Sequence, residues 1–182
     1  TIRMLTGVSI PTEGKATIMG FDIRRQSVSA KEQMGIVPDI SNIYNELSAW
    51  DNLIFTGKLY DLPKAYRENR AEELLKMFGL YERRRDKVEG FSRGMKRRIC
   101  IAMALMNKGN ILFLDEPTSG LDPVALITHK ELIVKEKAAG KTIIITSHIM
   151  SFVEEISDEI VFILDGNIYF QGSISALKHQ TK

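Results

Sequence analysis

Short runs of consecutive apolar residues constrain the fold of this chain most. Residues 34–37 (MGIV), 111–114 (ILFL) and 143–145 (III) contain no polar side chain. Uniformly apolar strands are typical of sheets buried on both faces, whereas strands with one wet face alternate apolar and polar residues. Helical patterns separate these runs along the chain. The alternation predicts an α/β domain built on a mainly parallel sheet.

Capping signals mark the predicted helix starts. Ser48 with Asp51 has the pattern of a capping box, and Ser92 precedes a long helical pattern. Asp122, which stands before a proline, is a good N-cap for a further helix. The helix-rich segment 40–106 is interpreted as an insertion between two strands of the sheet.

The two ends of the chain differ in what they predict. EIVFILDGNIYFQG (residues 159–172) has the pattern of a hairpin that turns at Asp165–Gly166. TIRMLTG (residues 1–7) lies within a helical pattern, with no initiator Met and no strand before it. We therefore expect this sequence to be a fragment that starts inside a larger domain.

Composition favours one packed domain and gives little support for nucleic-acid binding. The chain has 182 residues, of which 44% are hydrophobic, and its net charge is only +2. No apolar run reaches the roughly 18 residues of a membrane-spanning helix, so a membrane link would come through a partner. We interpret Lys96–Arg98 as mostly a solvated face, and expect the core to include three residues: Cys100, Met103 and Met106.

Two adjacent carboxylates, Asp115 and Glu116, follow the apolar run at 111–114. Burying unpaired anions costs several kcal/mol, so a cation or a water to be activated is the natural explanation. Ligands of parallel sheets bind beyond the carboxyl ends of the strands. An Asp there can hold Mg²⁺, and the adjacent Glu can orient or deprotonate a water that attacks a phosphoryl group.

In order and spacing, the motifs of this chain resemble those of the ATP-binding subunits of ABC transporters. LDEPTSGLD is similar to the Walker B motif and D-loop, FSRGM (residues 91–95) to the signature, and TSH, ending at His148, to the switch-histidine motif. TIRMLTG is similar to the helix after a phosphate loop, and MGIVPD to the Q-loop strand. The resemblance covers the whole chain. Within the family, FSRGMKRR and NIYNELSAWDNL are most similar to ABC-2 type exporters, the drug-efflux group.

The resemblance implies a P-loop NTPase (RecA-like) fold, α/β with a mainly parallel sheet, that lacks its N-terminal strands and phosphate loop. It implies a single truncated domain over residues 1–182. Residues 1–39 and 107–182 would form the core, and residues 40–106 a helical subdomain that carries the signature.

The resemblance also implies roles for individual residues. Asp115 and Asp39 would bind Mg²⁺, Glu116 would polarise the attacking water, and His148 would reach the γ-phosphate. The residues that would contact ATP or the facing subunit are Ser92, Arg93, Gly94, Met95, Asp39, Ser119, Gly120 and Asp122. Two ATP molecules would lie in a head-to-tail dimer, which works with integral membrane permease subunits as a peripheral complex on the cytoplasmic side of the cell membrane.

Three departures from the family pattern stand out. No phosphate loop ending in GK[ST] occurs, Asp39 replaces the Q-loop glutamine, and Arg93 replaces the first signature glycine. We expect the truncated chain to be inactive alone, because such a loop supplies most phosphate binding. We expect turnover in the complete protein to survive the two substitutions, since Ser92 and Gly94 remain.

Two alternatives remain open. If the gene product begins near Thr1, the chain would be a non-hydrolysing, regulatory or degenerate partner subunit that contributes only its signature. Alternatively, it would be a soluble ABC ATPase that acts on ribosomes or DNA. Against the latter, the chain has no second cassette, no coiled-coil heptads and no strongly basic surface.

Overall fold

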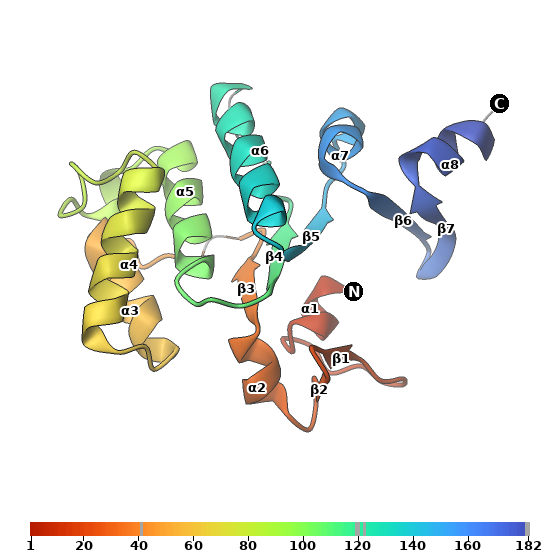
Figure 1. Cartoon of the computed structure of the whole chain (residues 1–182), viewed down its shortest axis with the longest axis horizontal. Helices are drawn as coiled ribbons and strands as arrows, with labels where there is room; N and C mark the ends of the chain where they lie inside the picture. The colour runs from red at the N-terminus through yellow and green to blue at the C-terminus, as the bar shows by residue number, and fades with distance from the viewer. Residues whose placement is uncertain (41, 119–120, 122, 181–182) are drawn as a thin grey trace. The chain divides into compact units, whose positions relative to one another are not determined.

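The computed structural model describes residues 1–40, 42–118, 121 and 123–180. It consists of two compact units, Thr1–Thr146 and Ser147–Lys182. The first unit contains, in chain order, α1 (Ile2–Leu5), β1 (Thr17–Ile18), β2 (Phe21–Asp22), α2 (Ser27–Glu32), β3 (Met34–Val37), α3 (Ala49–Leu59), α4 (Lys64–Met77), the 3-10 turn η1 (Val88–Gly90), α5 (Arg93–Ala104), β4 (Ile111–Asp115), α6 (Pro123–Ala138) and β5 (Thr142–Thr146) (Figure 1).

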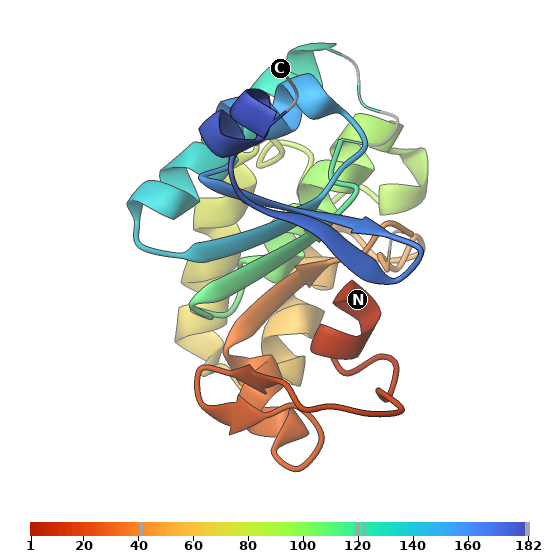
Figure 2. The same ribbon diagram turned by 90° about the vertical axis from the view of Figure 1, so that its right-hand side faces the viewer.

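The first unit is built on a three-stranded parallel sheet in the order β3-β4-β5 (Figure 2). The predicted parallel α/β sheet is therefore confirmed. β3 and β4 are neighbours in the sheet although α3, α4 and α5 come between them in the chain. The helix-rich segment is thus an insertion between two adjacent strands, as predicted.

Both faces of this sheet are covered. On one face Met34 and Phe113 lie in an apolar cluster that also includes Ile18 of β1, with Ile2 of α1 packed against it. On the other face α5 approaches β3 so closely that a Cβ at Gly35 would lie 2.2 Å from the backbone oxygen of Ala104. Only glycine leaves room for such a contact. Burial on both faces explains why these strands are uniformly apolar.

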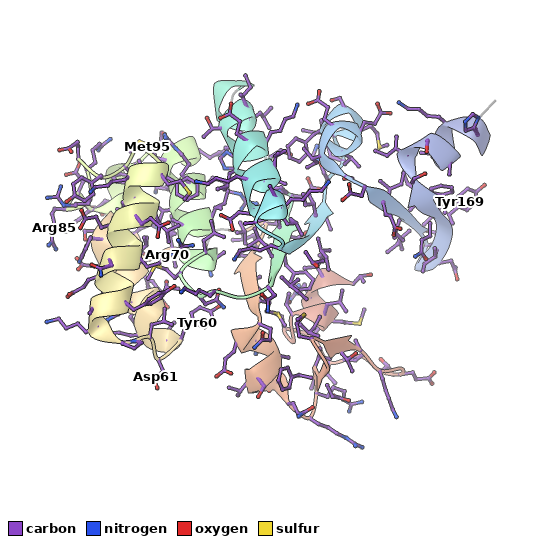
Figure 3. All side chains as sticks on the ribbon, viewed as in Figure 1. Tyr60, Asp61, Arg70, Arg85, Met95 and Tyr169 are labelled. Atoms are coloured by element: carbon purple, nitrogen blue, oxygen red, sulfur yellow. The ribbon has the colours of Figure 1, made fainter. Side chains whose placement is uncertain are left out.

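The inserted helices α3, α4 and α5 contact one another (Figure 1). α3 begins as predicted at Ser48, whose hydroxyl oxygen accepts a hydrogen bond from the Asp51 amide at 3.0 Å. Arg70 of α4 donates through Nε and Nη2 to the backbone oxygen of Leu105, at 3.2 and 3.1 Å (Figure 3). The predicted core residues are buried: Cys100, Met103 and Met106.

The second unit contains α7 (Met150–Ile156), β6 (Glu159–Leu164), β7 (Asn167–Ser173) and α8 (Ile174–Gln180). β6 and β7 pair in antiparallel fashion, and the turn residues Asp165 and Gly166 both have positive φ, 48° and 79°. This is the geometry of a two-residue type I′ turn, so the predicted hairpin is confirmed. Within the described part of the chain, no helix has the length and apolar character needed to cross a membrane.

Candidate active site at the carboxyl edge of the parallel sheet

The carboxyl ends of the three parallel strands bring the predicted acidic residues to one edge of the sheet. β4 ends at Asp115, which is followed by Glu116, and β3 is followed by Pro38 and Asp39. Asp115 and Glu116 are half-buried, whereas Asp39 is exposed. We refer to Asp39, Asp115 and Glu116 together as the acidic edge.

Thr146, the last residue of β5, binds two residues of the acidic edge. It is the register partner of Asp115 in the sheet. Its hydroxyl donates to Oδ1 of Asp115 and accepts a hydrogen bond from the Glu116 amide at 3.0 Å. One side chain therefore sets both the carboxylate of Asp115 and the peptide that follows it. Thr146 has no role predicted from the sequence.

The backbone of Glu116 adopts a conformation that is unfavourable for a non-glycine residue. Its φ is 45°, in the left-handed region. Such a conformation costs about 1–3 kcal/mol and persists only where surrounding contacts fix it. Residues held in this way are concentrated at active sites, which agrees with the predicted role of Glu116.

The prediction that Lys96–Arg98 form a mostly solvated face is wrong for Arg97. Its side chain is buried, with a relative exposure of 7%. It donates hydrogen bonds to the backbone oxygens of residues that follow β3 and β4 or end β4: Pro38, Asp39, Asp115, Glu116 and Pro117. Burial lowers the pKa of the guanidinium, and the neighbouring Cys100 and acidic edge act in the opposite direction.

Lys96 and Arg98, on either side of Arg97, are half-buried rather than fully solvated. Nζ of Lys96 donates to Oδ1 of Asn45 at 3.0 Å, and Nη1 of Arg98 donates to the backbone oxygen of Phe78 at 2.9 Å. Both bonds join α5 to other segments of the insertion. Arg97 differs from both neighbours because its side chain is more deeply buried and binds five backbone carbonyls.

The N-terminus of α5 carries the residues 91–95 of the signature-like motif. Ser92 is the N-cap, and its Oγ accepts a hydrogen bond from the Met95 amide at 3.3 Å. Ser92 and Arg93 are exposed, while Gly94 and Met95 are half-buried. Unpaired amides and the helix dipole make the N-terminus of a 12-residue helix attractive to anions.

Four further predicted residues lie outside the described part of the first unit. Ser119, Gly120 and Asp122 lie outside the described residues. His148 is exposed and belongs to the second unit. The roles given to these four residues, and the division of the chain at residues 39/40 and 106/107, stay predictions.

The acidic edge supplies the oxygen ligands that Mg²⁺ prefers, and it fits an ion shared with phosphates. Within the described ranges no three His, Cys, Asp or Glu side chains are grouped closely enough to hold a metal ion. Mg²⁺ is usually bound by one or two carboxylates, with waters and substrate phosphates completing its six positions. Asp115, with one carboxylate oxygen bound by Thr146, is suited to that role.

A parallel sheet with carboxylates at the carboxyl ends of its strands is the arrangement at which α/β nucleotide-binding domains hold their ligands. The sequence profile of the family described as ABC transporter matches residues 1–119. The chain therefore belongs to the ABC transporter family, and it is an ATP-binding domain of that family.

Named relatives agree with this assignment. The linearmycin resistance ATP-binding protein LnrL of Bacillus subtilis is 41% identical over 95% of this chain and 56% of its own length. The Nod factor export ATP-binding protein I of Cupriavidus pinatubonensis is 34% identical over 94% of this chain and 53% of its own length. The chain thus spans about half the length of these curated relatives.

A solved structure confirms the fold. The ATP-binding subunit of an ABC transporter superposes with a TM-score of 0.89 and 28% identity, over 99% of this chain and 75% of that one. This match extends over both units, and it bears out the prediction of a P-loop NTPase fold with an inserted helical segment.

Proposed function

We propose that the complete protein is the ATP-hydrolysing subunit of an ABC exporter, and that this hydrolysis drives export through a partner membrane permease. The observation that carries the proposal is the acidic edge, where Asp115 and the strained Glu116 are both held by Thr146. Family membership supports ATP as the nucleotide. The names of two relatives, which refer to linearmycin resistance and to Nod factor export, support export as the direction.

The residues of the acidic edge have distinct chemical roles in this proposal. Asp115 binds Mg²⁺ directly or through water, and Asp39 adds a second carboxylate near the ion. Glu116 orients the attacking water and accepts its proton as the γ-phosphoryl group is transferred. Mg²⁺, when bound, neutralises charge that develops on the phosphate oxygens. His148 is proposed, from the family resemblance, to interact with the γ-phosphate.

The N-terminus of α5 is proposed to bind the γ-phosphate of an ATP held by a facing subunit. Ser92 and Gly94 supply a hydroxyl and a backbone amide next to the positive end of the helix dipole. The exposed guanidinium of Arg93 replaces the close backbone approach of a glycine by a charge contact. Ser119, Gly120 and Asp122 contact that subunit too. The resulting head-to-tail dimer holds two ATP molecules and docks on permease subunits at the cytoplasmic face of the membrane.

The proposal is tested by Glu116→Gln in the complete gene product. The change keeps the shape of the side chain and removes its ability to accept a proton. We expect ATP hydrolysis to fall by at least about a hundredfold while ATP still binds and the dimer, detected by size-exclusion chromatography, is retained. The matched control is Glu13→Gln, which makes the same change at an exposed position near the start of the sequence. This variant should hydrolyse ATP normally. Undiminished hydrolysis by Glu116→Gln would remove Glu116 from its role.

A further inference from the structure

We propose that Arg97 is a positioning residue, whose guanidinium fixes the backbone of the acidic edge against the helix that carries the signature-like motif. The inference rests on the proposed function, because it concerns the residues that bind Mg²⁺ and orient water there. Arg97 itself is buried.

The hydrogen bonds of Arg97 match its donors one for one. Nε donates to the oxygen of Pro117 at 3.3 Å. Nη1 donates to Pro38 and Asp39 at 2.7 and 3.5 Å, and Nη2 to Asp115 and Glu116 at 2.7 and 3.0 Å. A guanidinium has five N–H donors in a rigid planar fork, so each donor has a carbonyl acceptor. Burial of the cation is compensated by this set of backbone dipoles.

These carbonyls belong to the two segments on which the acidic edge depends. The Pro38 and Asp39 oxygens lie just after β3, and the Asp115, Glu116 and Pro117 oxygens lie at the end of β4 or just after it. A single planar group that binds both segments fixes the spacing between them. The separation between the carboxylate of Asp39 and those of Asp115 and Glu116 is therefore set partly by Arg97.

Arg97 also stabilises the left-handed conformation of Glu116. Its Nη2 binds the carbonyls on both sides of the Glu116 Cα, those of Asp115 and of Glu116 itself. The amide of Glu116 is bound by Thr146 at 3.0 Å. Both peptides that flank this Cα are thus fixed, which is the condition under which a strained backbone persists.

Arg97 connects the acidic edge to the N-terminus of α5. Ser92, the N-cap, and Arg97 are on the same helix, about one and a half turns apart. A displacement of α5 by a ligand at its N-terminus would move the guanidinium, and with it the carbonyls that the guanidinium binds. The geometry therefore links binding at the signature-like motif to the position of Glu116.

The role depends on the shape of the guanidinium and not only on its charge. Lysine keeps the positive charge but presents three donors from one point on a flexible stem, so it cannot satisfy five divergent carbonyls. Glutamine removes the charge and most of the donors. Comparison of Arg97→Lys with Arg97→Gln therefore separates positioning from simple charge balance. Arg98→Gln is the matched control, because Arg98 is adjacent and bonds one carbonyl outside the site.

The experiment measures two properties of the complete gene product. The first is amide hydrogen exchange, without nucleotide, in peptides that cover residues 36–40 and 113–118. The second is steady-state ATP hydrolysis, with kcat and KM determined separately. In both Arg97 variants we expect exchange in the two peptides to accelerate at least about tenfold, while exchange in α3 and α4 is unchanged. We expect kcat to fall at least about tenfold, and KM for ATP to change less than about threefold.

Specific results would overturn the inference. Wild-type exchange in both peptides would show that the backbone of the acidic edge does not depend on Arg97. Wild-type kcat in Arg97→Lys would show that a positive charge is sufficient and that the shape of the guanidinium is not required. If Arg98→Gln changes hydrogen exchange and kcat as much as the Arg97 variants do, Arg97 contributes only to the general stability of α5. If Arg97→Gln does not fold, Arg97→Lys decides by the same two measurements. If the wild-type protein hydrolyses no ATP, the proposed function fails, while hydrogen exchange still decides the role of Arg97.

Discussion

Thr146→Val gives the sharpest test of how the acidic edge is held together. Valine has nearly the shape of threonine, so the change removes one hydroxyl and leaves packing almost unaltered. That hydroxyl donates to Asp115 and accepts from the Glu116 amide. A hydrogen bond to a charged group contributes about 1.5–3 kcal/mol and a neutral one about 0.5–1.5 kcal/mol. Because Asp115 and Glu116 are half-buried, water compensates in the variant for part of both lost hydrogen bonds.

The expected net loss in the free energy of unfolding is therefore about 2 kcal/mol, or about 4–8 °C in Tm for a domain of this size. We also expect kcat to fall about 10–100-fold, because the Glu116 peptide can relax from its left-handed conformation and displace the carboxylate by a fraction of an ångström or more. Urea unfolding, followed by circular dichroism, and phosphate release measure the two effects in the complete gene product.

The control is Thr142→Val, which makes the same chemical change at the exposed first residue of the same strand. Its effect should lie within about 0.5 kcal/mol of zero. If Thr146→Val unfolds at the same urea concentration as Thr142→Val and hydrolyses ATP at the same rate, the hydroxyl does not hold the acidic edge and the reasoning is wrong.

Two further predictions concern packing around β3. Gly35→Ala should destabilise the protein by about 1–3 kcal/mol, because its Cβ would lie 2.2 Å from the Ala104 oxygen. Gly90→Ala is the control and should leave stability unchanged, because its Cβ would meet no atom within 4 Å. Equal urea midpoints for the two variants would contradict the close contact at Gly35. Burial raises the pKa of Tyr60, whose hydroxyl donates to the Met34 oxygen at 3.4 Å. The neutral phenol is thus favoured in the folded state, so its contribution to stability is complete below pH about 10 and is lost as pH rises through the raised pKa. Tyr60→Phe should weaken this alkaline loss of stability, and unchanged unfolding between pH 9 and 11 would contradict that expectation.

The sheet could be predicted from the sequence because burial on two faces leaves a direct mark on composition. The apolar runs at β3, β4 and β5 each correspond to a strand of the parallel sheet. The elements that were not predicted are short: β2 has two residues, α2 six and α8 seven. Two to seven residues carry too little periodicity to be distinguished from a turn.

Part of the candidate site was equally visible in the sequence. Asp115 and Glu116 are adjacent and directly follow an apolar run, so their chemistry and their place at a strand end are both local features. Thr146 acts through strand register, which pairs it with Asp115 from about thirty residues away. No local pattern reports that pairing, and threonine is common at the ends of strands.

Arg97 was misinterpreted because three consecutive basic residues on a helix usually form a solvated face. A signal for burial was present in the helical periodicity. Arg97 lies four residues before Ile101 and seven before Ala104, both buried, so it occupies the apolar face of α5 while its neighbours flank that face. A cation in line with buried residues needs partners, and the carbonyls at the ends of β3 and β4 are those partners.

The same placement explains why a buried arginine is compatible with an acidic site. An arginine paired directly with Asp115 or Glu116 would compete with Mg²⁺ and hold the carboxylates away from water. The hydrogen bonds of Arg97 go to backbone oxygens, so Arg97 contributes positive charge at the acidic edge without itself pairing with the carboxylates. Two groups thus support the geometry of the acidic edge: Thr146, which binds one carboxylate oxygen of Asp115 and the Glu116 amide, and Arg97, which binds backbone oxygens only.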